Sequence, residues 1–261
     1  MNIPTMIHES NAIAGVAVKQ LKNKVDVIMT NFESTAKTLN CKAKVIKVGN
    51  PISLDFGRYT REEARALAGI PKDVETVVLS LGGSLGARRI NESMLKVMLD
   101  LTSKRPSVMH FHACGKRDLA YAQKSFAEYG LEGKENLVLS EYIYNMPVMM
   151  AAADIVICRA GAMTLSEVAA MRRAAIIVPS PNVTDDHQYK NAKQLADADA
   201  AIVIRESALT DKLMVETIDA LIKNPARREK MAENISAFAA DDVRRTIYFE
   251  ICDLLKKGQQ K

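Results

Sequence analysis

The sequence predicts an α/β fold built on parallel sheets, and two observations support this prediction. Short apolar runs alternate with helical patterns along most of the 261 residues, as expected when crossover helices join parallel strands. The runs are apolar on both faces, which is typical of strands covered by helices on each side. The expected strands are 3–7, 25–29, 44–48, 76–81, 107–113, 137–140, 154–158, 174–178 and 200–204. The clearest helical patterns are 87–100, 117–129, 164–172, 186–198, 207–223 and 242–257.

The first strand is the apolar run IPTMI, and a polar turn follows it at once. This turn contains His8, Glu9, Ser10 and Asn11, and a helical pattern begins after it. A strand, a polar turn and a helix start are the usual layout of a loop that carries a binding site in an α/β protein.

The alternation breaks once, after the third strand. The turn sequence G-N-P at 49–51 is followed by a polar stretch before the next strand, which predicts a domain boundary near residue 53. Only three strands precede this boundary, whereas six strands with their helices follow it. We therefore expect a first-domain remnant, a complete second domain and a helix that packs back on the first domain, over residues 1–52, 53–241 and 242–261 respectively.

Composition limits the classes of function. The net charge is +5 and there is no tryptophan, and no basic run is interleaved with aromatic residues, so we expect no nucleic acid partner. Phosphate-bearing molecules and an anionic membrane surface remain as partners. No run of about 18 apolar residues is present, so any membrane contact is expected to be peripheral. The dispersed cysteines indicate free thiols in a reducing compartment; they are Cys41, Cys114, Cys158 and Cys252.

The sequence VVLSLGGSLGARRINE predicts a strand, a glycine-rich turn and a helix. Paired glycines allow a ligand to approach the backbone closely, and the helix N-terminus offers N–H groups that suit a phosphate. Gly83 and Ser84 are therefore phosphate-binding candidates. The same letters contain G-x-S-x-G, the nucleophile elbow of serine hydrolases. A hydrolase with Ser84 as nucleophile and His110, His112 or His187 as base is thus an alternative.

Two other patterns are expected to be structural. Asp197 and Asp199 form a D-x-D match, a pattern that holds a metal in some nucleotide-sugar enzymes, but they lie in a turn and are expected at the surface. His110 and His112 alternate on one face of a strand and are expected to be packed there. No other cluster has the spacing of metal ligands, so we expect no metal and no cofactor.

The sequence CRAGAMTLSEVAAM has two interpretations. Thr164-x-x-Glu167 matches a capping box, in which Thr164 caps a helix and Glu167 bonds back to its N–H. Alternatively, Glu167 accepts both hydroxyl groups of a ribose, because the two oxygens of a carboxylate match a vicinal diol. The sequence leaves both interpretations open.

Two more loops offer candidates. In VPSPNVTDDHQYKNAKQL, Asp185 and Asp186 are expected to cap a helix, and His187 and Gln188 in its first turn could face a sugar. An amide both donates and accepts hydrogen bonds, as hydroxyls do, so Gln188 could read them; exposed polar residues on a capped helix are the alternative. In SEYIYNMPVMM, the backbone of Ile143 could pair with a uracil edge.

The glycine-rich turn and the segments that contain Glu167, Gln188 and Ile143 all follow the carboxyl ends of strands in the predicted six-stranded domain. That edge is where open α/β sheets bind ligands. A phosphate turn, a ribose carboxylate, a base-covering loop and a sugar-reading amide together predict a nucleotide-sugar site. A dinucleotide-dependent dehydrogenase does not fit, because GGSLGA lacks the G-x-G-x-x-G spacing.

The segments IHESNAIAG, GNPI, GGSLGA, AGAMTLSE and DDHQYKNA carry a resemblance over almost the whole chain. Their order and context are similar to those of the bacterial UDP-N-acetylglucosamine:undecaprenyl-pyrophosphoryl-N-acetylmuramyl-pentapeptide N-acetylglucosaminyltransferases. The resemblance implies a GT-B fold, here with one complete Rossmann-like domain and the C-terminal remnant of another. It also implies inverting, metal-independent transfer of N-acetylglucosamine from UDP-N-acetylglucosamine to the undecaprenyl-linked muramyl-pentapeptide. That reaction belongs to peptidoglycan synthesis at the cytoplasmic face of the cell membrane.

The resemblance assigns roles to individual residues. It implies that Asn11 contacts the donor sugar or diphosphate, that Ser84 binds diphosphate and that Ile143 presents its backbone to uracil. It further implies that Glu167 holds the ribose and that Gln188 reads the sugar hydroxyls. Weaker candidates for substrate contact are Ser53, Gly83, Thr164 and His187.

The sequence departs from the family's pattern in three places. Ser53 stands where the family typically has an arginine, for which Arg58 is a candidate substitute, and His187 stands where a second glutamine is frequent. The glycine-rich loop with a histidine that begins the family is not in the sequence, so the general base is unassigned. His8 and Glu9 are implied to line the acceptor side. We therefore expect donor binding without turnover, and a non-catalytic nucleotide-sugar-binding module is the alternative.

Overall fold

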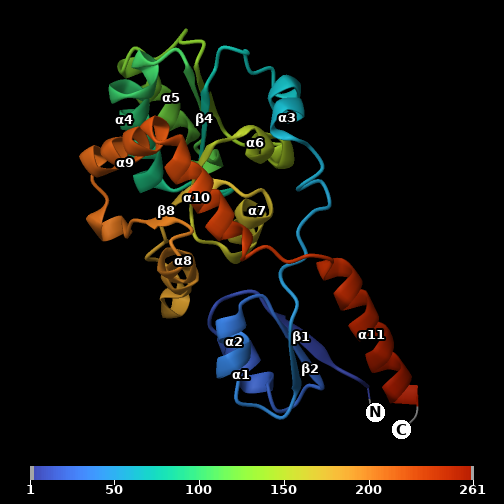
Figure 1. The fold of residues 1–261 in the computed structure, drawn as a ribbon. Helices are drawn as coiled ribbons and strands as arrows, with labels where there is room; N and C mark the ends of the chain where they lie inside the picture. Colours follow the sequence, from blue (N-terminus) through green and yellow to red (C-terminus); the bar gives the residue numbers. More distant parts are fainter. Residues whose placement is uncertain (1–2, 260–261) are drawn as a thin grey trace.

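The computed structural model describes residues 3–259, and its strands form two separate sheets in which every pairing is parallel (Figure 1). The strands are β1 Met6–Glu9, β2 Val27–Thr30, β3 Lys44–Lys47, β4 Thr76–Leu81, β5 Val108–Ala113, β6 Leu137–Ser140, β7 Ile155–Cys158, β8 Ala174–Ile177 and β9 Ile202–Val203. The first sheet has the order β1-β2-β3, and the second has the order β6-β5-β4-β7-β8-β9. The predicted α/β class and all nine predicted strands are confirmed.

Helices connect the strands, including several short ones that the sequence pattern did not single out. The helices are α1 Val16–Leu21, α2 Glu33–Thr38, α3 Arg61–Leu67, α4 Arg88–Asp100, α5 Leu119–Glu128, α6 Met146–Ala152, α7 Ala162–Ala170, α8 His187–Asp197, α9 Asp211–Lys223, α10 Pro225–Ser236 and α11 Val243–Gln259. Of the helices with six or seven residues, only the start of α1 was predicted. Helices α2, α3 and α6 were missed because six or seven residues make less than two full turns, too few for a clear 3.6-residue period.

Strand β1 begins three residues later than predicted and contains His8 and Glu9. These residues pair with Met29 and Thr30 of β2, so the prediction that they form a polar turn was wrong. Their backbone groups complete the parallel ladder, whereas the polarity of their side chains had indicated the end of the strand. The turn begins only at Ser10.

Helix α11 covers the first sheet (Figure 1). Val243 is buried with Val27 and Met29 of β2, and Ile247 packs against the same apolar cluster. An ion pair of 2.9 Å between Lys44 Nζ and a carboxylate oxygen of Glu250 lies beside it. The predicted boundary near residue 53 falls between the two sheets. Residues 1–2 and 260–261 of the predicted terminal segments lie outside the described residues.

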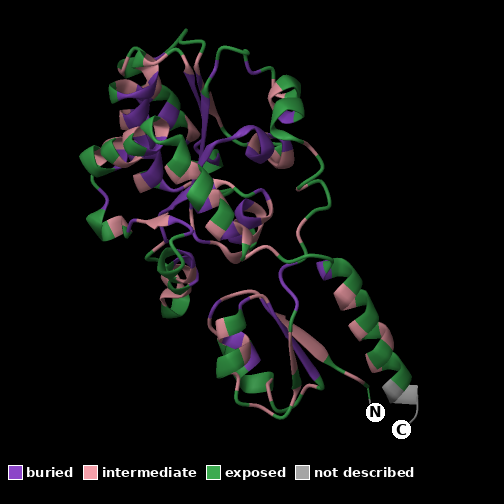
Figure 2. Ribbon diagram, in the orientation of Figure 1, coloured by how far each residue is buried: buried purple, intermediate pink, exposed green. Residues whose placement is uncertain are grey.

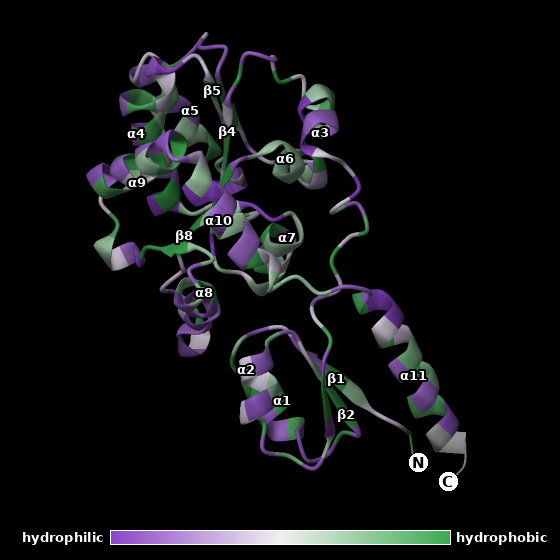
Figure 3. Ribbon diagram, in the orientation of Figure 1, coloured by the Kyte–Doolittle hydropathy of each residue, from purple (hydrophilic) through white to green (hydrophobic). Residues whose placement is uncertain are grey.

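The second sheet is buried on both faces (Figure 2). Side chains alternate along its strands, so that Val78 and Ile176 join the core beneath α4 and α9, while Leu79 and Ile177 join the core beneath α6 and α7. Figure 3 shows β4 and β8 as hydrophobic ribbons within more polar helices. Helices on both faces leave only the ends of the strands free for a ligand.

Asparagine side chains join the parts of the chain that carry the two sheets, which we call the first and the second domain. The backbone N–H of Ala12 donates to Asn191 Oδ1 over 2.8 Å, and Asn191 Nδ2 donates to Asn11 Oδ1 over 3.0 Å. Asn50 Nδ2 donates to Ser166 Oγ over 3.0 Å. Asn191 is fully buried and Asn50 nearly so, and a buried amide without partners would be costly. These bonds therefore favour one relative placement of the domains.

A buried carboxylate anchors α3 to the second sheet. Asp154 Oδ2 accepts hydrogen bonds from Arg65 Nη2 over 2.6 Å and from the backbone N–H of Val77 over 2.7 Å. Arg61 Nη1 lies 3.1 Å from the other oxygen. The side chain of Asp154 is only 3% exposed, so its charge depends on these partners.

Replacing Asp154 by alanine is expected to lower the free energy of unfolding by about 3–5 kcal/mol, because it removes the carboxylate that pairs with Arg65 and accepts from the Val77 N–H. Denaturation in urea, followed by circular dichroism, measures the change. Asp73→Ala, in an exposed turn, is the control and should change stability by less than about 0.5 kcal/mol. Equal effects of the two substitutions would contradict the anchoring role.

Candidate functional site

A cavity of about 700 Å³ opens at the carboxyl edge of the second sheet. Its volume lies within the range of roughly 300–1,000 Å³ that is usual for small-molecule sites. The glycine-rich turn after β4 and the loop after β7 both line it. The strand order changes direction between these two strands, so the cavity lies at the topological switch point. All of its lining residues fall between Leu81 and Glu206, within the second domain.

The conformation of the glycine-rich turn depends on close contacts between its glycines and neighbouring backbone atoms. Gly86 has φ +81°, and a Cβ atom on it would overlap the carbonyl oxygen of Cys114. A Cβ on Gly115 would overlap the backbone of Gly86 in return, and one on Gly82 would lie 2.5 Å from the nitrogen of Ala87. Gly83 has φ +88° but faces open space. The turn is thus packed on the loop after β5, and Gly83 is its open point.

The wall of the cavity carries an excess of positive charge, because four arginines and two glutamates line it. They are Arg88, Arg89, Arg117, Arg159, Glu92 and Glu206. Guanidinium groups with a helix N-terminus nearby suit a diphosphate. The sequence pattern had assigned no role to these arginines, although Arg159 directly follows a strand at the carboxyl edge.

Arg159 is held in place by the loop after β8. Its Nη1 donates to the carbonyl oxygens of Val178 and Pro179 over 3.1 and 3.2 Å. Its Nη2 forms an ion pair with Glu206. The guanidinium is therefore fixed at the cavity wall, with both of its edges occupied.

Gln188 lines the cavity, but only half of its amide is free. Its Oε1 accepts hydrogen bonds from the backbone N–H groups of Ala160 and Ser180, over 3.2 and 2.9 Å. Its Oε1 thus has two backbone partners and its NH₂ group remains as a donor, so the role of Gln188 as a reader of sugar hydroxyls stays a prediction. The amide also ties the loops after β7 and β8 together.

The start of α8 is not capped by aspartate side chains, contrary to the prediction. Asp186 occupies the N-cap position with φ +50° and makes no capping bond. Its carboxylate pairs with Arg205 over 3.1 Å, and that of Asp185 pairs with Lys19 over 3.5 Å. His187 Nδ1 donates to the carbonyl oxygen of Thr184 over 3.0 Å, and His187 does not line the cavity.

The predicted capping box of α7 does not form. The helix begins at Ala162 with Gly161 at the N-cap, so Thr164 lies within the first turn and lines the cavity instead. Glu167 lies one turn further on the same side of the helix, although it is not among the lining residues. Its half-buried carboxylate has no hydrogen bond or ion pair to another described residue. Burial raises the pKa of Glu167 to about 7. A carboxylate in this state lacks the partners that hydroxyl donors would supply.

Ile143 has a buried side chain within the core. None of the backbone hydrogen bonds among the described residues uses its N–H or C=O group. Tyr142 and Tyr144 flank it with rings in edge-to-face contact at 5.2 Å, and their side chains are exposed. These two aromatic groups, which the sequence reasoning missed, lie next to the backbone groups that were proposed for uracil.

The candidates of the first domain have structural partners. Glu9 is 4% exposed, and its carboxylate accepts from the backbone N–H groups of Asn11 and Gly15 over 2.9 and 2.6 Å. The side chain of Asn11 bonds both Glu9 and the second domain. His8 Nε2 donates to the carbonyl oxygen of Gly49 over 2.8 Å. These bonds close the loop after β1, so the structure gives no support to ligand contacts by these three side chains.

Ser53 and Arg58 form a local turn outside the cavity. Ser53 Oγ donates to Asp55 Oδ2 over 3.1 Å, and Arg58 Nη1 lies 3.6 Å from Asp55 Oδ1. Neither residue is among those that line the cavity. The structure thus does not place Arg58 as a substitute for the arginine that the family has near position 53.

A serine hydrolase site is not assembled. Ser84 is exposed, and none of the described histidines has a recorded contact with it. His110 and His112 are fully buried and bond Ser80 instead, over 2.9 and 2.8 Å.

Both aspartates of the D-x-D match form ion pairs at the surface. Asp197 Oδ1 lies 2.6 Å from Lys193 Nζ, and the carboxylate of Asp199 pairs with Arg227. Within residues 3–259, no cluster of three or more histidine, cysteine or acidic side chains could hold a metal. In the same part of the chain, no helix is both long and apolar enough to cross a membrane.

Residues 77–247 match the family described as glycosyltransferase family 28 C-terminal domain. The UDP-N-acetylglucosamine–N-acetylmuramyl-(pentapeptide) pyrophosphoryl-undecaprenol N-acetylglucosamine transferase of Acetivibrio thermocellus is 36% identical over 256 residues, which cover 98% of this chain and 68% of that protein. The enzyme of the same name from Halalkalibacterium halodurans is 33% identical, over 98% of this chain and 69% of that protein.

Solved structures agree with this relationship. The crystal structure of Acinetobacter baumannii MurG is 30% identical, with a TM-score of 0.74, over 95% of this chain and 66% of that one. The glycosyltransferase WaaG, at 16% identity and a TM-score of 0.58, shares the fold. The chain spans about two thirds of the length of these relatives.

Replacing Gly86 by alanine is expected to lower the free energy of unfolding by more than about 2 kcal/mol, because the new Cβ overlaps the Cys114 carbonyl and the positive φ is strained. Gly133→Ala is the matched control, since Gly133 has φ +73° and open space around its Cβ. Its cost should be the backbone strain alone, about 1–2 kcal/mol. Urea denaturation of both variants measures the difference, and equal losses would show that the contact with Cys114 has no influence.

Proposed function

The chain belongs to the family of UDP-N-acetylglucosamine–N-acetylmuramyl-(pentapeptide) pyrophosphoryl-undecaprenol N-acetylglucosamine transferases, and on that premise we propose that its cavity binds UDP-N-acetylglucosamine. The observation that carries the proposal is Glu167, a half-buried carboxylate with a pKa near 7 and no partner among the described residues. Its two oxygens can accept both hydroxyls of the ribose. Those two hydrogen bonds would offset the cost of burying the charge.

With the ribose at Glu167, the other parts of the donor can be placed as well. The unbonded backbone of Ile143 pairs with the uracil edge. The diphosphate lies against Gly83 and Ser84 at the N-terminus of α4, where the open space, the helix dipole and the arginines favour it. The free NH₂ group of Gln188 donates to a sugar hydroxyl.

The reaction proposed is the transfer of N-acetylglucosamine for which the family is named, with inversion at the anomeric carbon. A hydroxyl of the undecaprenyl-linked muramyl-pentapeptide attacks the anomeric carbon, and UDP leaves from the opposite face. The enzyme contributes by placing the donor and by stabilising the negative charge that develops on the leaving diphosphate. No base is assigned to the acceptor hydroxyl, because His8 and Glu9 are engaged within the first domain.

We place this chemistry at the cytoplasmic face of the membrane, with the protein bound peripherally. The acceptor is lipid-linked, so the enzyme must reach it at the bilayer surface. A net charge of +5 favours contact with anionic lipid headgroups.

Replacing Glu167 by glutamine is expected to weaken the binding of UDP-N-acetylglucosamine by about tenfold or more, because a neutral amide cannot accept two charge-assisted hydrogen bonds. The unmodified chain should bind more tightly as the pH rises through about 7, since hydroxyl donors require the ionised carboxylate and the pKa of Glu167 lies near 7. Glu167→Gln should lose this pH dependence. Calorimetry between pH 6 and pH 8, roughly one unit on each side of that pKa, measures both effects.

The control is Glu132→Gln, which removes the same charge at an exposed position and should leave the affinity unchanged. Absence of binding to the unmodified chain would overturn the site assignment. A transfer assay with a lipid-linked acceptor, run on the same preparation, measures whether bound donor is also turned over.

A further inference from the structure

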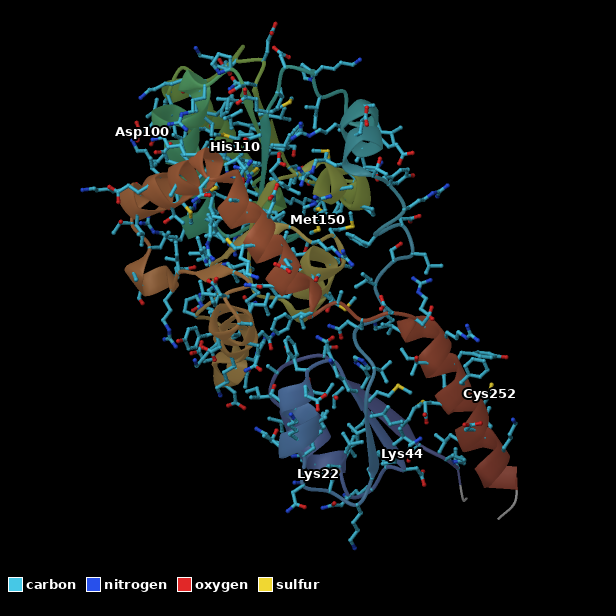
Figure 4. All side chains as sticks on the ribbon, in the orientation of Figure 1. Lys22, Lys44, Asp100, His110, Met150 and Cys252 are labelled. Atoms are coloured by element: carbon cyan, nitrogen blue, oxygen red, sulfur yellow. The ribbon has the colours of Figure 1, made fainter. Side chains whose placement is uncertain are left out.

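A row of buried polar side chains runs beneath the glycine-rich turn. Its members lie just after α4, on the neighbouring strands β5 and β4, on α4 itself and in the loop after β5. Figure 4 labels His110, one of these members. Five of its six members are fully buried, and the sixth, Asp118, is 2% exposed. In order, the members are Thr102, His110, Ser80, His112, Asn91 and Asp118. So many buried polar groups persist only if each has a partner.

The direction of the hydrogen bonds is determined at the Asn91 end. Asn91 Nδ2 donates to the carbonyl oxygen of Cys114 over 2.9 Å and to Asp118 Oδ2 over 3.0 Å. Its Oδ1 therefore faces His112 Nε2, at 3.1 Å, and that nitrogen must donate. Burial lowers the pKa of His112 to about 4, so the ring is neutral and its Nδ1 can only accept.

The remaining bonds then follow one after another. Ser80 Oγ donates to His112 Nδ1 over 2.8 Å and accepts from His110 Nε2 over 2.9 Å. His110 Nδ1, now without a proton, accepts from Thr102 Oγ1 over 3.4 Å. Every bond donates toward Asp118, and bonds aligned in one direction polarise and strengthen one another.

Asp118 connects this row to the cavity. Its Oδ1 lies 3.4 Å from Arg88 Nη2 and 3.8 Å from Arg117 Nε, and both arginines line the cavity. The guanidinium of Arg88 also lies 3.8 Å from the centre of the Tyr121 ring. The guanidinium of Arg88 thus stacks on the Tyr121 ring and pairs with Asp118, while 46% of the side chain remains exposed.

We propose that Asp118, held by this row of hydrogen bonds, positions Arg88 and Arg117 as the cations that bind the diphosphate of the donor. The proposal rests on the proposed function and adds the residues that set its preference for a diphosphate. A buried carboxylate with fixed oxygens orients the two guanidinium groups before a ligand arrives, which reduces the entropy lost on binding. The row makes this orientation rigid, because Asp118 cannot turn without breaking the bond from Asn91.

The same amide also holds the glycine-rich turn. Asn91 bonds the Cys114 carbonyl, and Gly86 packs directly on that carbonyl. One side chain therefore connects the backbone that faces the phosphates with the carboxylate behind the arginines.

The test compares two ligands, uridine and UDP, by calorimetry on the full chain. Asp118→Asn keeps the size of the side chain but presents an amide to the arginines. We expect its affinity for UDP to fall by about tenfold, the loss of a charge-assisted contact, with the affinity for uridine unchanged. Asp73→Asn, which removes the same charge in an exposed turn, should alter neither affinity.

A purely structural role of Asp118 would lower both affinities alike, and that result, or unchanged UDP binding, would overturn the proposal. Arg88→Gln leaves the buried row intact and should give the same selective loss of UDP binding if Asp118→Asn does not fold. An unselective effect of Arg88→Gln would also overturn it. If the unmodified chain binds uridine and UDP equally, the diphosphate contacts fail while the nucleoside site stands; if it binds neither, the proposed function fails as well.

Discussion

The contact of Gly86 with the backbone of Cys114 and Gly115 is the constraint on which the candidate site depends. Two loops that follow neighbouring strands approach until their main chains touch, which only glycine permits at these positions. Asn91 holds the Cys114 carbonyl from the other side. The turn after β4 is thereby kept open above the helix N-terminus, where a cavity of about 700 Å³ remains. Helices cover both faces of the sheet, so a ligand of the second sheet is expected at the ends of its strands.

The two domains meet at the rim of this cavity through α8. Gln188 and Asn191 lie three residues apart, on neighbouring positions of that helix. Gln188 bonds the loops after β7 and β8, whereas Asn191 bonds the loop after β1. A movement of the first domain would therefore act on the same helix that carries a sugar-reading candidate. This linkage connects the first domain to the cavity although it contributes no lining residue.

Charge is distributed over the site in a way that fits a nucleotide sugar. Arginines gather around the glycine-rich turn, and each has a carboxylate or carbonyl that orients it. Glu167, on the neighbouring helix α7, carries a half-buried carboxylate that has no hydrogen bond or ion pair to another described residue, and burial raises its pKa to about 7. Anionic phosphates would be drawn to the first region and neutral hydroxyl donors to the second, which sets the direction in which a donor would lie.

The sequence by itself determined the local features of this protein. Runs of apolar residues were enough to find all nine strands, with β1 displaced by a few residues, and the paired glycines before α4 were enough to locate the glycine-rich turn. It also singled out Glu167, since the two oxygens of a carboxylate near a helix start match a vicinal diol. What it could not decide was which partner each polar side chain would choose. Thr164 matches the sequence pattern of a helix N-cap, yet the helix begins at Ala162.

Only the tertiary structure decided the roles of Glu9, Asn11 and Asn191. Asn11 and Asn191 are 180 positions apart in the chain, and Asn91 and Asp118 are 27 apart. Periodicity and spacing report on neighbours within a few residues, because they arise from the geometry of single helices and strands. Hydrogen bonds between distant residues depend on which loops the folded sheet brings together, and no local pattern records that choice.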